Sequence, residues 1–174
     1  WSRPNSNNIQ EIDFVTIATA ADSLDFGDLI TPTNYGAGAA SPTRGILLGG
    51  NNESPLAGMK SRIEFITIPT LGNGQDFGDL SQNHFFNITA ASNSIRALAW
   101  GGTYPDTTTT TNIIEFVTIA TKGNGVDFGD TTRGVSAPQA TASSTRSVCY
   151  GGNGGGDNIV EYVNIMTQGN AVDF

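Results

Sequence analysis

The sequence predicts an all-β protein in which a unit of about fifty residues recurs and builds four-stranded antiparallel sheets. One β-branched and aromatic segment occurs four times, and each copy is followed at one fixed distance by Asp-Phe. Between these copies, an Arg stands five residues before a diglycine on three occasions. The 22 glycines, with abundant Thr, Ser and Asn, fit short strands and tight turns, so we expect no helix.

The recurring segment has the composition of a strand, because β-branched and aromatic residues favour a pleated, half-buried surface. Its copies occupy residues 12–17, 63–68, 114–119 and 160–165. The pairs that follow are Asp25-Phe26, Asp76-Phe77, Asp127-Phe128 and Asp173-Phe174. Between segment and pair lies a turn sequence, which is Gly72-Asn73-Gly74, Gly123-Asn124-Gly125 or Gly169-Asn170-Ala171 in three copies. These features predict the third and fourth strands of each sheet, joined by a glycine-rich hairpin.

The first two strands of each sheet are predicted between these hairpins. Small residues at 38–40, 90–91 and 140–142 form the first strand, and a tight turn follows. An apolar strand then begins near Arg44, Arg96 or Arg146 and ends at a diglycine. The diglycines are Gly49-Gly50, Gly101-Gly102 and Gly151-Gly152.

The third strand is apolar on both of its faces. Ile63 and Phe65 point to one side and Ile66 and Ile68 to the other, since side chains alternate along a strand. A sheet of a two-layer sandwich would need extra cover, whereas a propeller blade is packed between two neighbours. The period also suits a propeller better than a β-helix, although a solenoid stays an alternative.

The diglycine after the second strand, an aromatic in the third and another near the fourth resemble the kelch repeat. Kelch units usually have Tyr and Trp at the aromatic positions. Here the third strand carries Phe14, Phe65, Phe116 and Tyr162, and the fourth carries Phe26, Phe77, Phe128 and Phe174. The resemblance implies a kelch-like β-propeller segment with about 3.5 repeats present.

The motifs Ile-Glu-Phe-Val-Thr-Ile-Ala-Thr, Gly-Asn and Asp-Phe-Gly-Asp also look like repeats in tail-fibre and other virion proteins of tailed phages, especially marine ones. This likeness implies an extracellular location on a virion. It also implies other virion or surface protein subunits and host glycans as partners.

We interpret residues 1–174 as a single repeat array with units at 9–50, 51–102, 103–152 and, in part, 153–174. It holds four second halves but three first halves, whereas closed propellers have about 4 to 8 blades. The chain also lacks an initiator Met and stops at Phe174, where sister copies continue into Gly-Asp. We therefore expect a piece of a longer polypeptide, or an oligomer that supplies the rest of a ring.

Charge and composition argue against two partners. The net charge of −8, with eight Lys and Arg in all, does not suit a nucleic-acid partner, because phosphate binding requires clustered cations. No apolar run is long enough to cross a bilayer, so no membrane partner is expected.

No catalytic, metal or cofactor site is expected. The carboxylate pairs recur in every unit, at Asp25 and Asp28, Asp76 and Asp79, and Asp127 and Asp130. Such repetition favours turn formation, Asx hydrogen bonds or ion pairs with Arg44, Arg96 or Arg146 over catalysis. His84 is the only histidine, which does not favour histidine-based catalysis. Cys149 holds the position in the second strand that Leu47 and Ala99 hold in other units, as a small buried residue would.

Binding residues are sought where the units differ, in the loops between second and third strands and between successive sheets. Both kinds of loop share one end of a propeller. Exposed Tyr can stack on a sugar ring while polar groups bond its hydroxyls. The candidates are Tyr35, Asn52, Glu53, His84, Tyr104, Asp106 and Asp157.

The sequence thus suggests a non-enzymatic structural or adhesion module of a virion. The alternative is a kelch-type protein-interaction scaffold inside a cell. The opposing interpretation of the candidate residues, that they belong to tolerated surface loops, stays open at this point.

Overall fold

A computed structural model describes residues 10–50, 61–82, 87–104, 108–153 and 158–174. In these residues the chain forms fourteen β-strands and no helix, hence no helix able to cross a membrane. The predicted all-β fold is confirmed.

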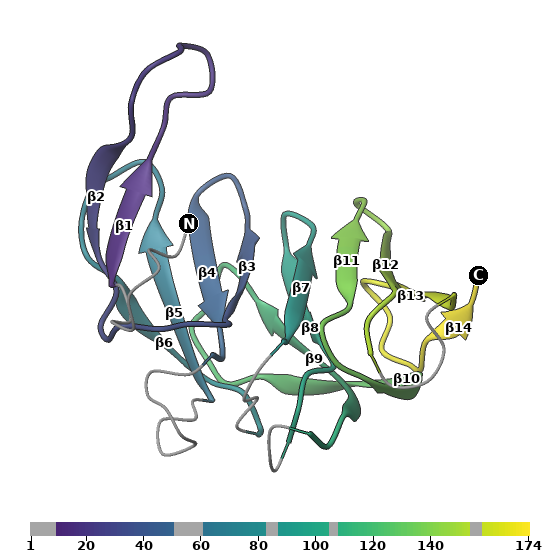
Figure 1. Ribbon diagram of the computed structural model, residues 1–174. Coiled ribbons are helices and arrows are strands. Elements are labelled where there is room, and N and C mark those ends of the chain that lie inside the picture. The colour runs from purple at the N-terminus through teal and green to yellow at the C-terminus, as the bar shows by residue number, and fades with distance from the viewer. Residues whose placement is uncertain (1–9, 51–60, 83–86, 105–107, 154–157) are drawn as a thin grey trace.

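Three four-stranded antiparallel sheets follow one another along the chain, after one two-stranded sheet (Figure 1). The two-stranded sheet is β1 (Glu11–Phe14) and β2 (Leu24–Asp28). The first four-stranded sheet is β3 (Ala37–Ala40), β4 (Arg44–Leu48), β5 (Arg62–Thr67) and β6 (Gln75–Asp79). The second is β7 (Thr89–Ser92), β8 (Arg96–Trp100), β9 (Thr111–Thr118) and β10 (Val126–Val135). The third is β11 (Gln139–Ala142), β12 (Arg146–Tyr150), β13 (Val160–Asn164) and β14 (Val172–Asp173).

Each sheet is a meander whose strands pair in chain order, which confirms the predicted four-stranded antiparallel pattern. The small-residue segments form its first strand, and the apolar segments that end before a diglycine form its second. Every four-stranded sheet takes two strands from one sequence unit and two from the next.

The sheets fan out so that their first strands, β3, β7 and β11, lie side by side (Figure 1). The side chain of Ser92 joins β7 to β3, since its Oγ donates to the carbonyl of Ala40 at 2.9 Å and accepts from the Ala40 amide at 3.1 Å. Alanine and glycine in these strands allow the backbones to approach closely.

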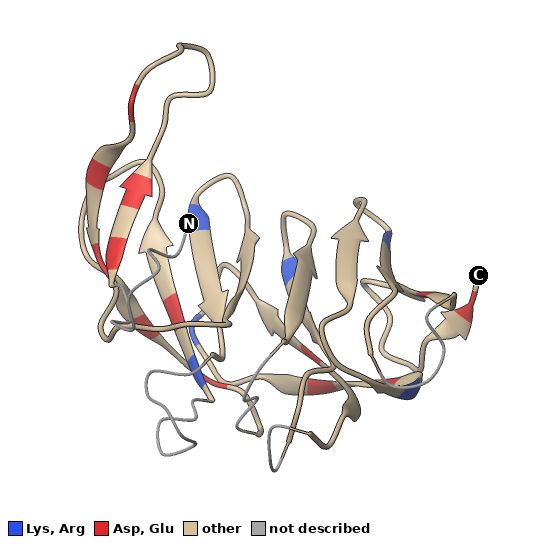
Figure 2. Cartoon of the chain, viewed as in Figure 1, with Lys and Arg blue, Asp and Glu red and all other residues tan. Residues whose placement is uncertain are grey.

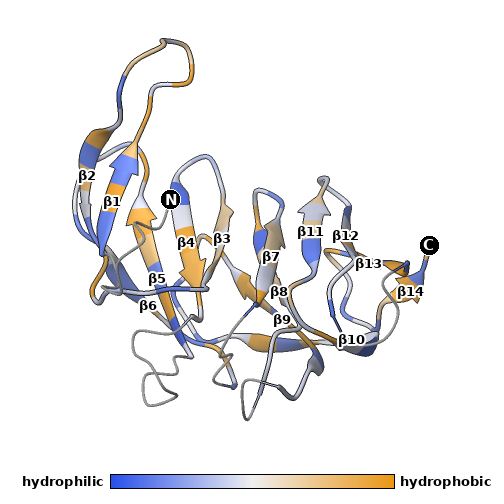
Figure 3. Ribbon diagram, viewed as in Figure 1, coloured by the Kyte–Doolittle hydropathy of each residue, from blue (hydrophilic) through white to orange (hydrophobic). Residues whose placement is uncertain are grey.

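The core lies between successive sheets. One buried cluster joins Ile46, Leu48 and Phe65 of the first four-stranded sheet to Val117 and Ile119 of the second. A second cluster repeats this packing between the second and third sheets. Figure 3 shows the hydrophobic residues concentrated in the middle strands, such as β4, β5, β8 and β9.

An aromatic pair and a cation recur in each four-stranded sheet. The two rings meet edge to face, as in Phe65 and Phe77 with centroids 6.0 Å apart. The guanidinium of Arg44 lies 4.8 Å from the Phe65 centroid, and Arg96 and Arg146 cover Phe116 and Tyr162 in the same way. Both contacts are favourable, because the negative face of a ring attracts the positive edge of another ring or a cation placed over it.

Each sheet is tied to the one before it through its glycine-rich turn. At the first junction, the Gly72 amide donates to the Phe26 carbonyl at 2.9 Å and the Gly74 amide to the Asp28 carbonyl at 2.7 Å. In return, the Asp28 amide donates to Asn73 Oδ1 at 3.1 Å. We call this set of three bonds the junction latch. It recurs at the next two junctions, made by residues 123–125 on 77–79 and by residues 169–171 on 128–130.

The latch explains the glycine of the Phe-Gly-Asp motif. Gly78 has a φ of +151°, and a Cβ built on it would lie 2.4 Å from the carbonyl oxygen of Gly123. A side chain is therefore excluded both by the backbone conformation and by the next turn.

We predict that Gly78→Ala destabilises the protein by about 1–3 kcal/mol for the strained backbone alone, with the steric contact adding to this. Urea denaturation followed by circular dichroism measures the effect. Gly38→Ala is the matched control, because its Cβ meets no atom within 4 Å and its φ lies outside the left-handed region. Equal unfolding midpoints for the two variants would contradict the role of the latch.

Candidate functional site

The strand ends that carry the loops differing between units gather at one end of the sheets. Antiparallel pairing places the end of each second strand beside the start of each first strand, at the lower end in Figure 1. Tyr35 and Tyr104 lie there. The other candidates, Asn52, Glu53, His84, Asp106 and Asp157, lie outside the described residues.

Tyr35 sits two residues before β3 on a positive-φ backbone (φ 59°), and its side chain is 58% exposed. Asn87 and Ala137 occupy the same place before β7 and β11, with φ values of 59° and 54°. The backbone at this position is thus part of the framework, while its side chain changes from Tyr to Asn to Ala. A fixed backbone with a varied, exposed side chain is what a recognition surface requires.

Tyr104 lies in the loop between β8 and β9, which is tied at its base. The Tyr104 amide donates to the Thr109 carbonyl at 2.9 Å, and Thr103 pairs with Thr110. The Tyr104 side chain is 37% exposed. Each of the two tyrosines offers a ring to solvent from a different sheet.

The repeated acids of the third strand serve the sheet junctions. Glu64, Glu115 and Glu161 are at most 3% exposed. Glu64 accepts the Ile30 amide at 2.9 Å, Glu115 the Ser81 amide at 3.0 Å and Glu161 the Thr132 amide at 2.8 Å. The hydroxyls of Ser81 and Thr132 also donate to these carboxylates. Each donor follows the Phe-Gly-Asp motif of the preceding sheet, Ile30 and Ser81 just after the strand and Thr132 within β10, so the glutamates reinforce the junction latch.

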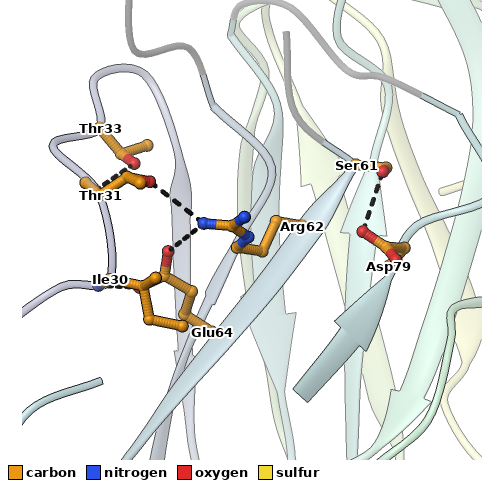
Figure 4. A network of polar contacts seen from close by, with 7 residues as sticks. All are labelled: Ile30, Thr31, Thr33, Ser61, Arg62, Glu64 and Asp79. Atoms are coloured by element: carbon orange, nitrogen blue, oxygen red, sulfur yellow. Dashed lines mark hydrogen bonds and ion pairs between the residues drawn. The ribbon is translucent and has the colours of Figure 1, made fainter. Parts of the chain in front are cut away.

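The cation beside the buried glutamate differs between junctions. Figure 4 shows Arg62 between Thr31 and Glu64, with Nη1 3.3 Å from the threonine hydroxyl and 3.7 Å from the carboxylate. At the third junction, Arg133 comes from β10 of the preceding sheet and donates to the Gly151 carbonyl at 3.1 Å. At the second junction, Ile113 stands in the place of Arg62.

Of the three roles suggested for the repeated aspartates, the ion pair with Arg44, Arg96 or Arg146 is not formed among the described residues. The arginines stack on aromatic rings, and Arg44 and Arg96 donate to the carbonyls of Ile119 and Ile165, at 2.9 Å and 3.2 Å. Asp28, Asp79 and Asp130 instead act in the latch through their backbone, and Asp79 Oδ1 accepts from the Ser61 hydroxyl at 3.0 Å. The position of a residue in the repeat does not show whether an arginine contacts an aspartate, a ring or a carbonyl group.

Burial raises the pKa of Glu115 above its ordinary value of 4.5; the Ser81 hydrogen bonds oppose this shift and the nearby Asp127 carboxylate adds to it. The folded state therefore binds a proton more tightly than the unfolded state. The contribution of Glu115 to stability is greatest below pH 4.5 and is lost as the pH rises through the folded pKa.

We predict that Glu115→Gln removes this dependence, because the amide oxygen can still accept from Ser81 but does not titrate. Urea midpoints are measured from pH 4 upwards, in steps of about half a unit. As the pH rises, the midpoint of the wild type should fall relative to that of the variant. Glu11→Gln, which removes an exposed carboxylate, is the control. A stability difference that stays constant with pH, or has the opposite slope, would contradict the assignment.

Cys149 is the small buried residue that was predicted. It is 3% exposed, and burial together with the Glu161 carboxylate raises the pKa of its thiol to about 12, against a smaller opposing effect of Arg133. Few thiolates are present near neutral pH, so no nucleophilic role is supported.

We predict that Cys149 reacts with a thiol reagent such as Ellman's reagent only after unfolding in urea. The variant Cys149→Ala with Tyr150→Cys moves the thiol by one residue to a 43% exposed position and should react in native buffer. Equal native rates for the two proteins would show that Cys149 is accessible.

A groove of about 710 Å³ opens beside the two-stranded sheet. Ile12 and Leu29 form one side, and Leu47 and Ile66 belong to the opposite side. The first strands of the three larger sheets, with Gly38, contribute the floor. Sequence reasoning missed this groove, because its walls come from strands far apart in the chain.

Charge is unevenly distributed along the chain. Residues 10–31 contain five acids and no Lys or Arg, and Figure 2 shows the acids on β1 and β2. Across the described ranges, no three His, Cys, Asp or Glu side chains are grouped so as to hold a metal ion.

Comparison of the chain with known protein families, and with curated proteins, found no match. Function must therefore be argued from the residues and the geometry.

Proposed function

We propose that the chain is a segment of a kelch-like β-propeller and serves as a non-enzymatic structural and adhesion module of a virion. The fanned stack of four-stranded sheets, with the small first strands innermost, supports the propeller arrangement. The recurring junction latch supports an architectural role, because the repeated polar residues are used between sheets.

The observation that carries the adhesion role is the contrast between a constant framework and a varied loop end. Tyr35 and Tyr104 are exposed there, on backbones fixed by positive φ or by loop hydrogen bonds. Such rings can stack on the faces of host glycans, and the same loops can contact neighbouring virion subunits.

A protein-binding scaffold is a second candidate, favoured by apolar side chains on the last sheet. Tyr150, Val172 and Phe174 are 43%, 55% and 73% exposed. A contiguous apolar surface of this kind suits a protein partner better than a sugar.

We predict binding on a glycan array that weakens roughly tenfold in Tyr104→Ala, the scale of losing one aromatic contact. Leu71→Ala is the control, because Leu71 is 65% exposed but lies in the turn between β5 and β6, at the opposite end of its sheet. Equal loss in both variants, or capture of a cellular protein without glycan binding, would contradict adhesion and favour the scaffold.

A further inference from the structure

Two asparagines of the junction latch stand in the sequence context that favours loss of the side-chain amide. In the first two glycine-rich turns the latch asparagine is followed by glycine, as Asn73-Gly74 and Asn124-Gly125. The backbone nitrogen of the next residue can attack an asparagine side chain, and glycine leaves this attack unhindered because it has no Cβ. Both asparagines are exposed, so solvent water reaches them.

The latch holds both reacting groups of such a pair on one residue of the preceding sheet. Asn73 Oδ1 accepts from the Asp28 amide at 3.1 Å, and the Gly74 amide donates to the Asp28 carbonyl at 2.7 Å. The attacking nitrogen must lose its proton before it bonds to the side-chain carbon, and that proton lies in a hydrogen bond at the short end of the usual range. The latched pair is therefore protected, and reaction requires the junction to open.

The second junction repeats this arrangement on Asp79. Asn124 Oδ1 accepts from the Asp79 amide at 3.1 Å, and the Gly125 amide donates to the Asp79 carbonyl at 2.7 Å. Two junctions of the array thus carry the same protected pair.

The third junction has the same hydrogen bonds and a less reactive pair. Asn170 Oδ1 accepts from the Asp130 amide at 3.1 Å, and the Ala171 amide donates to the Asp130 carbonyl at 2.7 Å. The alanine side chain hinders attack by its nitrogen. Ala171 also shows that a Cβ fits at this place, so the chain contains an internal reference with an equal latch and lower reactivity.

We propose that Asn73 and Asn124 are modification sites, which convert to isoaspartate when their junction opens. The glycine nitrogen bonds to the side-chain carbon Cγ, its proton leaves with the amide group as ammonia, and a cyclic succinimide forms. Water then opens the ring. Cleavage at the main-chain carbonyl gives isoaspartate and cleavage at the side-chain carbonyl gives aspartate, and the reaction needs no reactant besides water.

Isoaspartate prevents the latch from closing in its original form. It adds one carbon atom to the main chain before the glycine, which moves the Gly74 amide out of register with the Asp28 carbonyl. The surroundings leave little room for this change, because a Cβ on Gly74 would already lie 3.1 Å from Glu64 Oε2 and 3.4 Å from the Leu29 Cα. The reaction also replaces a neutral amide by a carboxylate near the buried Glu64. This modification requires neither ligand nor partner, so it stands apart from the adhesion role.

The test incubates the whole chain, folded or in urea, in mildly alkaline water enriched in heavy oxygen. Mass spectrometry of tryptic peptides reports each asparagine separately, and the heavy oxygen marks products formed during the incubation. We expect Asn73 and Asn124 to react in urea and at least roughly tenfold more slowly in the folded chain. Asn170 should react slowly under both conditions.

Two glycine variants each disturb one junction. A Cβ on Gly27 would lie 2.9 Å from Asn73 Oδ1, and one on Gly78 would lie 3.0 Å from the Asn124 amide nitrogen. In the folded chain, Gly27→Ala should accelerate the reaction at Asn73 alone and Gly78→Ala that at Asn124 alone. Gly38→Ala, whose Cβ meets no atom within 4 Å, should change neither.

A third variant tests the chemistry without depending on the fold. Gly74→Ala gives the first junction the Asn-Ala pair of the third. It should slow the reaction of Asn73 in urea, while Asn124 in the same chain reacts as before. Chains that have reacted in urea and are then refolded should unfold at a lower urea concentration than fresh chains treated alike.

Equal rates in the folded and unfolded chain would overturn the proposal, as would an absence of reaction at both asparagines in urea. Acceleration of both sites by Gly27→Ala would also overturn it, because the reaction would then follow global unfolding and not the opening of one junction. Equal unfolding midpoints for reacted and fresh chains would show that the latch tolerates isoaspartate. None of these outcomes depends on glycan binding.

Discussion

The junction between successive sheets is the constraint on which the structure depends. Each four-stranded sheet is apolar on both faces, so none can bury its residues alone. The latch holds neighbouring sheets together with three hydrogen bonds, and a buried glutamate accepts a further hydrogen bond nearby. The turn, the Phe-Gly-Asp strand and the glutamate recur because every junction needs all three. Six of the sixteen acidic residues stand in these junction motifs: Asp28, Asp79, Asp130, Glu64, Glu115 and Glu161.

The two-stranded sheet departs from this pattern in a consistent way. Where later units have a buried Glu it has Asp13, and where they have Gly-Asn-Gly it has Ala21, Asp22 and Ser23. It receives the latch of the first four-stranded sheet at Phe26 and Asp28. Its strands carry acidic side chains, whereas the last sheet has exposed aromatic and aliphatic side chains, among them Tyr150 and Val172.

The strands could be predicted from the sequence because their signals are local. Alternation, diglycines and glycine-rich turns are contained within about ten residues, and repetition reinforced each assignment. The partners of Arg44, the burial of Glu115 and the exposure of Ile68 could not be predicted in this way. They depend on contacts between sheets, such as Ser81 with Glu115, which are 34 residues apart. Of the candidate binding residues, Tyr35 and Tyr104 lie at the expected loop end, and their role as a site stays a prediction because side-chain variation alone does not identify a ligand.

Native-state hydrogen exchange of the latch amides tests most directly whether the junctions hold the structure together. The amides of Gly74, Gly125 and Ala171 donate across the three junctions at 2.7 Å each. If the sheets form one cooperative stack, these amides exchange with the same opening free energy as amides within β5, β9 and β13. Exchange of the latch amides through low-energy local opening, with the strand amides still protected, would show that the sheets are stable independently and would contradict the account.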